Sequence, residues 1–123
     1  MSEISVETKP LWEILVPYKI GRRTVQVPYH QIWDKKVVDI TGGLTLQKVS
    51  KGMWVSPTTD KTHSELMIPV RIACSKEQIL EIMEFTITHY KQEAVFCTKI
   101  SDETLIMYAT TSEIWRSYKL SGN

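Results

Sequence analysis

The sequence predicts an α+β fold, a mostly antiparallel sheet with two helices packed on one of its faces. The 123 residues are 42% hydrophobic and 24% charged, which is ordinary for one globular domain. Apolar side chains alternate with period two in several segments and recur at helical spacing in two others. The order strand, helix, strand, strand occurs twice. Elements in this order form a sheet with its helices on one side.

Three regions follow from composition. We expect residues 1–10 to be a flexible lead-in, residues 11–109 to be the single domain, and residues 110–123 to be a tail or terminal helical turn. The leading residues lack the apolar stretch of a signal peptide, and no apolar run approaches the ~20 residues of a membrane span. We therefore expect a cytoplasmic protein, in the host cell's cytoplasm if a phage encodes it.

The first half begins with a short apolar run, Leu11–Val16, which predicts a buried strand. Residues 17–28 lie between two prolines and predict a basic loop. Apolar residues at three- and four-residue steps predict a helix over Tyr29–Ile40, and two glycines follow its end. Residues 44–49 and 53–56 predict two strands joined by a hairpin or a bulge.

The second half contains the clearest strand pattern, the alternation over Glu65–Cys74. Proline cannot donate to a ladder, so Pro69 predicts that this strand lies at an edge or carries a bulge. Ser75 and Gln78 form a capping box that predicts a helix to about Gln92. Residues 94–100 and 104–109 predict a final hairpin. The sheet face opposite the helices is left uncovered, which favours a homo-oligomer.

Charge and cysteines exclude some classes of protein. The net charge of +1 argues against binding of long nucleic acids, which needs a strong basic excess, although a local phosphate pocket needs only two or three cations. Cys74 and Cys97 lie in apolar runs and read as buried free thiols. No Cys/His grouping has zinc spacing, so we expect no metal and no cofactor.

Catalytic patterns are weak. His30 and Asp34 share a helix face at four-residue spacing, and His63 could join them in a small phosphoesterase or nuclease. The simpler reading is that they solvate the polar side of the helix. Gly42-Gly43-Leu44-Thr45 could cradle a phosphate, but helix termination explains the glycines better. We expect no enzyme activity.

Isolated cations beside aromatic side chains are more informative. Flat rings suit a nucleobase and guanidinium groups suit phosphate, so this pairing is typical of nucleotide sites. Ordinary surface and interface packing is the alternative. The candidate ligand-binding residues are Arg71, Phe85, His89, Lys51, Trp54, Arg22, Arg23 and Arg116.

Several runs resemble one family of short phage proteins. They are LWEILVP, YHQIWDKKVVDITGGLT, KGMWVSP, ELMIPVRIACSKEQI and AVFCTKISDE, and they span Leu11 to about Ala109. The family is the first-described anti-Thoeris proteins, sponges that sequester a cyclic ADP-ribose signal made by bacterial TIR-domain enzymes. The resemblance implies an oligomer that binds glyco-cyclic ADP-ribose, and in some members cyclic oligonucleotides, without cleaving it. It does not extend beyond Ala109, which weakens any role for Arg116.

Three functions remain open from the sequence. The first is a non-enzymatic sponge for a cyclic ADP-ribose-type nucleotide. The second is the phosphoesterase or nuclease that uses His30, Asp34 and His63. The third is an oligomeric protein-interaction module whose apolar face binds a larger protein.

Overall fold

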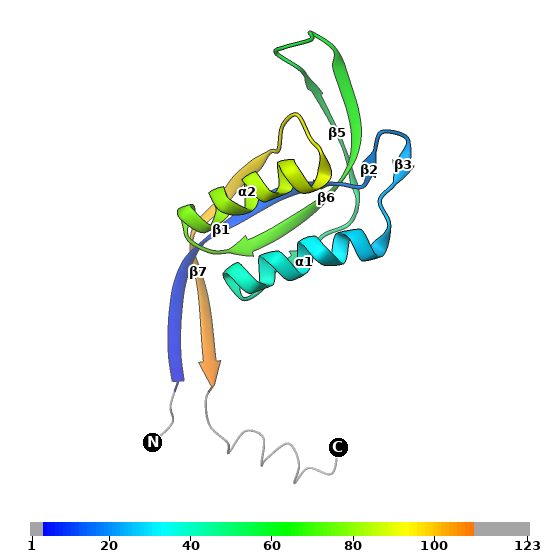
Figure 1. The fold of residues 1–123 in the computed structure, drawn as a ribbon. Coiled ribbons are helices and arrows are strands. Elements are labelled where there is room, and N and C mark those ends of the chain that lie inside the picture. Colours follow the sequence, from blue (N-terminus) through cyan, green and yellow to red (C-terminus); the bar gives the residue numbers. More distant parts are fainter. Residues whose placement is uncertain (1–3, 110–123) are drawn as a thin grey trace.

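The computed structural model describes residues 4–109, which form one α+β unit (Figure 1). Two helices lie on one face of a five-stranded sheet, and a small two-stranded sheet lies beside it. The fold class predicted from the sequence is confirmed. The elements in chain order are β1 (Ile4–Pro17), β2 (Lys19–Ile20), β3 (Arg23–Thr24), α1 (Val27–Thr41), β4 (Thr45–Leu46), β5 (Ser50–Val55), β6 (Thr62–Ala73), α2 (Lys76–Tyr90) and β7 (Cys97–Ala109).

All strand pairings are antiparallel, and β6 lies inside the sheet rather than at its edge. On one side β6 pairs with β1, which pairs in turn with β7. On its other side β4 and then β5 pair with successive parts of β6. Residues 44–56 therefore do not form the expected hairpin, because both strands use β6 as their partner.

Pro69 explains why β4 and β5 are separate strands. Its partner Leu15 donates its N–H to the carbonyl of Phe96, the residue before β7, so the nitrogen of Pro69 faces the β4 and β5 side. Proline has no N–H to give there, and the ladder is interrupted between Leu46 and Ser50. Only the Pro69 carbonyl is used, accepting from the Gln47 N–H at 2.9 Å. The expected irregularity is present, but not at an edge.

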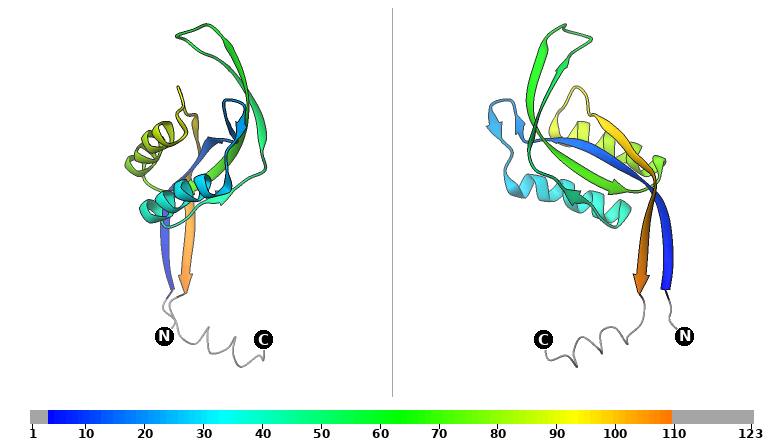
Figure 2. Two further views of the ribbon diagram at one scale, coloured as in Figure 1. Left: turned by 45° about the vertical axis from the view of Figure 1, so that its right-hand side comes forward. Right: turned by 180° about the vertical axis from the view of Figure 1, so that it is seen from behind.

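The capping residues predict the start of α2 and the end of α1, while α2 ends at Tyr90, with Lys91 in a left-handed conformation, short of the expected Gln92. Pro28 lies in the first turn of α1, and Gly42 ends it with φ of 91°, a left-handed conformation that favours glycine. The capping box of Ser75 and Gln78 starts α2, as predicted. The helices pack against the same sheet face, as Figure 2 shows from two further directions. The core between them includes Ile14, Val70, Ile72, Trp33, Val37, Ile79, Ile82 and Tyr90.

Two expectations about the chain ends are wrong. The segment expected to be a flexible lead-in belongs to β1 from Ile4 onward, because residues 4–9 pair with residues 104–109. The expected hairpin over residues 94–109 is instead the single strand β7, with a register shift near Ser101 where a turn was expected. These paired ends of β1 and β7 project from the sheet as a two-stranded arm. Residues 110–123 lie outside the described part of the chain. No helix within residues 4–109 is long and apolar enough to span a membrane.

Candidate functional site

The sheet face opposite the helices, here called the open face, carries the first candidate site. Because Val70 and Ile72 are buried under the helices, alternation places Arg71 on the opposite face of β6. The same alternation on β1 places Glu13 opposite Arg71. No helix among residues 4–109 covers this face.

Arg71 lines a hollow of about 460 Å³ at the foot of the arm. Lys9 supplies a second cation, and Tyr108 supplies a hydroxyl group. Arg71 Nε donates to Glu13 Oε1 at 3.5 Å, while Lys9 forms a 3.3 Å ion pair with Glu7. Both cations are thus paired with carboxylates from β1. The remaining lining residues are Leu11, Thr41, Gly42, Gly43, Leu44, Thr45, Ala73, Thr104 and Ile106.

The glycine turn after α1 forms one wall of this hollow. The helix ends there, as the sequence indicated. The Gly42 N–H donates a hydrogen bond to the Val38 carbonyl at 2.8 Å. Thr41 Oγ1 bridges the turn, donating to the Val37 or Gly43 carbonyl at 2.8 and 3.0 Å. The turn is therefore a fixed, hydroxyl-lined wall beside Arg71. The same residues, Thr41 to Gly43, end the helix and form part of the hollow.

Trp54 lines a second hollow on the open face, of about 250 Å³. Its ring stacks on His63 with centroids 4.7 Å apart and meets Phe96 edge-on at 5.7 Å. Leu15 and Met67 form the floor. This hollow is mostly apolar and aromatic, as expected of a surface that accepts a flat ring, and Glu65 and Thr98 also line it.

The two hollows lie along the same strand. Met67 and Arg71 are four residues apart on the open face of β6, a separation of about 13 Å in an extended chain. An aromatic subsite and a cationic subsite are thus held by one rigid strand. A ligand with a base at one end and phosphate at the other fits this arrangement.

Phe85 and His89 lie on the other side of the molecule. Their rings stack at 5.2 Å, and His89 also stacks on Tyr29 of α1 at 4.0 Å. His89 Nε2 lies 2.9 Å from the Tyr29 carbonyl, and Lys36 lies over the Phe85 ring. Both faces of the His89 ring are occupied. These residues tie α1 to α2 and do not join Arg71.

The other predicted residues are dispersed. Lys51 is the strand partner of Leu66 and lies on the opposite face of β5 from Trp54, so these two candidates do not share a site. Arg22 and Arg23 lie at the exposed β2–β3 hairpin, where Arg23 borders a hollow of about 510 Å³ with Tyr29 and Lys91. Arg116 lies outside the described residues.

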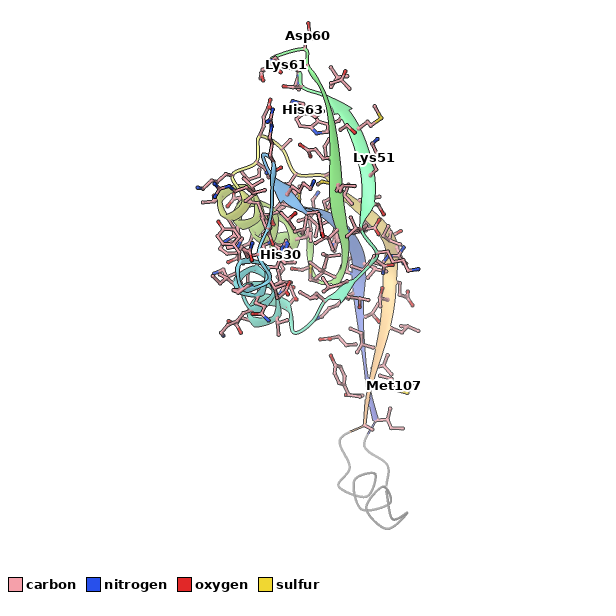
Figure 3. The ribbon with its side chains drawn as sticks, turned by 90° about the vertical axis from the view of Figure 1, so that its right-hand side faces the viewer. His30, Lys51, Asp60, Lys61, His63 and Met107 are labelled. Carbon is pink, nitrogen blue, oxygen red and sulfur yellow. The ribbon has the colours of Figure 1, made fainter. Side chains whose placement is uncertain are left out.

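His30 and Asp34 do share a groove of about 270 Å³ between α1 and strands β4 and β6. His30 Nδ1 lies 2.7 Å from the Tyr90 hydroxyl oxygen. Burial lowers the pKa of His30 and raises that of Asp34. His63 is elsewhere, stacked on Trp54 on the open face, and Figure 3 shows it well apart from His30. The three residues of the phosphoesterase alternative therefore do not form one site.

The two cysteines are free thiols, with Cys74 buried and Cys97 partly buried. Burial raises the pKa of each to about 11. A thiol with so high a pKa is almost wholly protonated near neutral pH and is a poor nucleophile.

Sequence reasoning missed Lys9, Phe96 and Tyr108. Lys9 and Tyr108 reach the Arg71 hollow only because β1 and β7 pair along the arm. The alternation of Ile4, Val6 and Thr8 with polar residues was a usable signal for that strand. No comparable signal links Phe96 to Trp54, because Phe96 precedes β7, and β6 and β1 lie between β5 and β7 in the sheet.

Comparison with known proteins bears on the fold. No protein-family model matches the chain, and no curated protein matches it significantly. A phage SAM lyase in complex with S-methyl-5'-thioadenosine is similar in structure, with a TM-score of 0.55 and 13% identity over 83% of this chain and 90% of that chain. The periplasmic divalent cation tolerance protein CutA from Archaeoglobus fulgidus has a TM-score of 0.50 and 8% identity, over 95% and 100% of the two chains. At these identities the likeness shows a shared fold.

Proposed function

We propose that this protein is a non-enzymatic sponge that binds a cyclic ADP-ribose-type nucleotide on its open face and so blocks TIR-based antiphage defence. The observation that carries the proposal is the pair of hollows on one sheet face, one holding Arg71 and Lys9 and the other holding Trp54 and Phe96. Phosphate would contact the cations and the base would stack in the aromatic hollow. The specific ligand and the anti-defence role rest on the family resemblance of the sequence.

The fold is compatible with a nucleoside ligand. The phage SAM lyase of similar fold binds S-methyl-5'-thioadenosine. That likeness says nothing of where a ligand sits in this chain. The placement on the open face comes from the side chains alone.

Binding without turnover is part of the proposal. Cleavage of a pyrophosphate or glycosidic bond needs a positioned acid or base, or a metal-activated water. The described residues that line the two open-face hollows are mostly cations, hydroxyls and apolar groups, and Glu65 in the Trp54 hollow is the one carboxylate among them. A sponge needs only affinity, and a dissociation constant near nanomolar corresponds to about −12 kcal/mol.

The open face also supports self-association. Each hollow is open to solvent on one side in a single chain, and a second copy over this face would enclose the ligand. We therefore propose that the working form is a homo-oligomer. Enclosure removes water from the phosphate contacts and strengthens them.

The test is to incubate protein with an excess of cyclic ADP-ribose isomers, separate the bound fraction, and heat it to release the ligand. The proposal expects stoichiometric ligand that runs identically to the input and again activates its TIR-pathway receptor. Steady accumulation of ADP-ribose or AMP would show an enzyme instead. If none of the isomers binds saturably, the sponge proposal is wrong and the protein-interaction module becomes the favoured function.

A further inference from the structure

The groove between α1 and strands β4 and β6 is separate from the open face. Val70 lines it and Arg71 lies on the other side of the same strand, so the sheet stands between the two sites. The groove has a volume of about 270 Å³. Its apolar walls come from Val16, Val27, Trp33, Leu46, Ile68 and Val70.

Four polar side chains line the groove beside these apolar walls: Gln31, which is exposed, and His30, Asp34 and Tyr90. His30 and Asp34 stand one helical turn apart on the same face of α1. Asp34 is the only formally charged side chain among the described residues that line the groove. Few polar groups in an otherwise apolar hollow are typical of a small-molecule site.

The protonation of His30 follows from its partner. Tyr90 is fully buried, and burial raises its pKa, so its hydroxyl keeps its proton. Within residues 4–109 the Tyr90 hydroxyl has one hydrogen-bond partner, His30 Nδ1 at 2.7 Å. Leaving the buried hydroxyl proton without an acceptor would be costly, which favours donation from Tyr90 to Nδ1 and the neutral tautomer with its proton on Nε2. The Nε2–H of His30 is then a hydrogen-bond donor that Tyr90 does not use.

Asp34 presents the complementary group. Its carboxylate oxygens accept hydrogen bonds, one helical turn from the imidazole donor. The side chains that line the groove bring no cation to Asp34. The groove lining thus includes a donor and an acceptor one helical turn apart, together with aliphatic and aromatic side chains.

We propose that this groove binds a flat heterocycle with an amino group beside an unprotonated ring nitrogen, as in adenine. The amino group donates to Asp34, and the ring nitrogen accepts from His30 Nε2. The apolar walls contact the two faces of the ring. This site is additional to the open-face site and does not depend on it.

The test measures binding of free adenine, purine and hypoxanthine by chemical-shift titration of the full chain. Purine lacks the amino group, and hypoxanthine carries a ring N–H and a carbonyl in place of the acceptor and the donor. Adenine is expected to bind about tenfold more tightly than either, since one charge-assisted contact is lost with purine and an opposed donor pair arises with hypoxanthine.

The variant Asp34→Ala should bind adenine as weakly as purine and leave purine binding unchanged. Asp39→Ala is the matched control, because Asp39 is on the same helix, is exposed and pairs with Lys35 at 3.0 Å. It should retain the preference for adenine. The melting temperature of each variant shows whether the fold is intact.

Arg71→Ala separates this proposal from the open-face function. Adenine binding unaffected by Arg71→Ala supports a separate groove site, whether or not the sponge proposal holds. The groove proposal is overturned if the three bases bind alike, if Asp34→Ala keeps the adenine preference, or if millimolar adenine gives no saturable shift. Loss of adenine binding in Arg71→Ala would also overturn it, by placing the base on the open face.

Discussion

Arg71 on β6 and Glu13 on β1 are direct cross-strand partners on the open face, and their side chains form an ion pair with Nε and Oε1 3.5 Å apart. Both side chains are partly exposed, so the pair contributes little to stability. The guanidinium has five N–H donors, and this contact uses one of them. Glu13 therefore orients Arg71 beside the hollow while leaving most of its donors available to an anion.

Arg71→Ala should weaken nucleotide binding about tenfold or more, because one charge-assisted contact with phosphate is worth ~1.5–3 kcal/mol. Titration calorimetry at two salt concentrations measures both the affinity and its electrostatic part. The melting temperature should change little, since Arg71 is outside the core. Arg22→Ala is the control, because Arg22 lies at the exposed β2–β3 hairpin. An unchanged nucleotide affinity in Arg71→Ala would show that Arg71 does not contact phosphate.

Glu13→Gln should have the opposite effect and tighten nucleotide binding several-fold. The neutral amide no longer competes with phosphate for the guanidinium or repels the ligand. The same calorimetric titration detects the change. A weaker complex would show that Glu13 is needed to position Arg71, and that its charge is not a cost to binding.

Thr86→Val should destabilise the fold through the loss of two buried hydrogen bonds. Trp33 Nε1 donates to Thr86 Oγ1 at 2.9 Å, and Oγ1 donates to the Ile82 carbonyl at 2.6 Å. Valine leaves the indole N–H without a partner, at a cost of ~1–3 kcal/mol. Urea unfolding measures the loss. Thr88→Val, the same change at an exposed position of α2, should be close to neutral.

The stability of the protein should fall as the pH is lowered from about 7 toward 5, in part through His30. Burial lowers the pKa of His30 in the folded state, so the unfolded chain, with a histidine pKa of about 6.5, takes up the proton more readily. The contribution of neutral His30 to the free energy of unfolding is present above a pH of about 6.5 and is lost as the pH falls below it. His30→Gln should flatten the free energy of unfolding across this range. An unaltered pH dependence in urea melts would contradict the assignment.

We expect an oligomer at micromolar concentration. The arm formed by β1 and β7 carries four apolar side chains on one face, each more than half exposed: Ile4, Val6, Leu105 and Met107. Figure 3 shows Met107 near the outer end of the arm. Met107→Glu should shift sedimentation toward a 14.2 kDa species, because a charge in an apolar interface is costly. Leu80→Glu, an exposed position on α2, is the control. Sedimentation of the wild-type protein as a monomer at high concentration would contradict this prediction.

Much of the architecture could be predicted from local sequence. The capping box at Ser75 and the glycine after Thr41 set helix boundaries through hydrogen bonds within a few residues, so they are visible in the sequence. The alternation over Glu65–Cys74 identified β6 and placed Arg71 away from the core for the same reason. The Pro69 irregularity was predictable, while its position inside the sheet was not.

By itself, the sequence determined the fold class, the two helices and the face on which Arg71 lies. Only the tertiary structure decided which residues accompany Arg71, because Lys9 and Tyr108 reach it through pairing of the two chain ends. It also assigned Phe85 and His89 to helix packing and separated His63 from His30. Periodicity reports which side of an element is buried, since burial follows from the local repeat. The neighbour across a sheet depends on strand order and register, which are set by contacts between residues far apart in the chain.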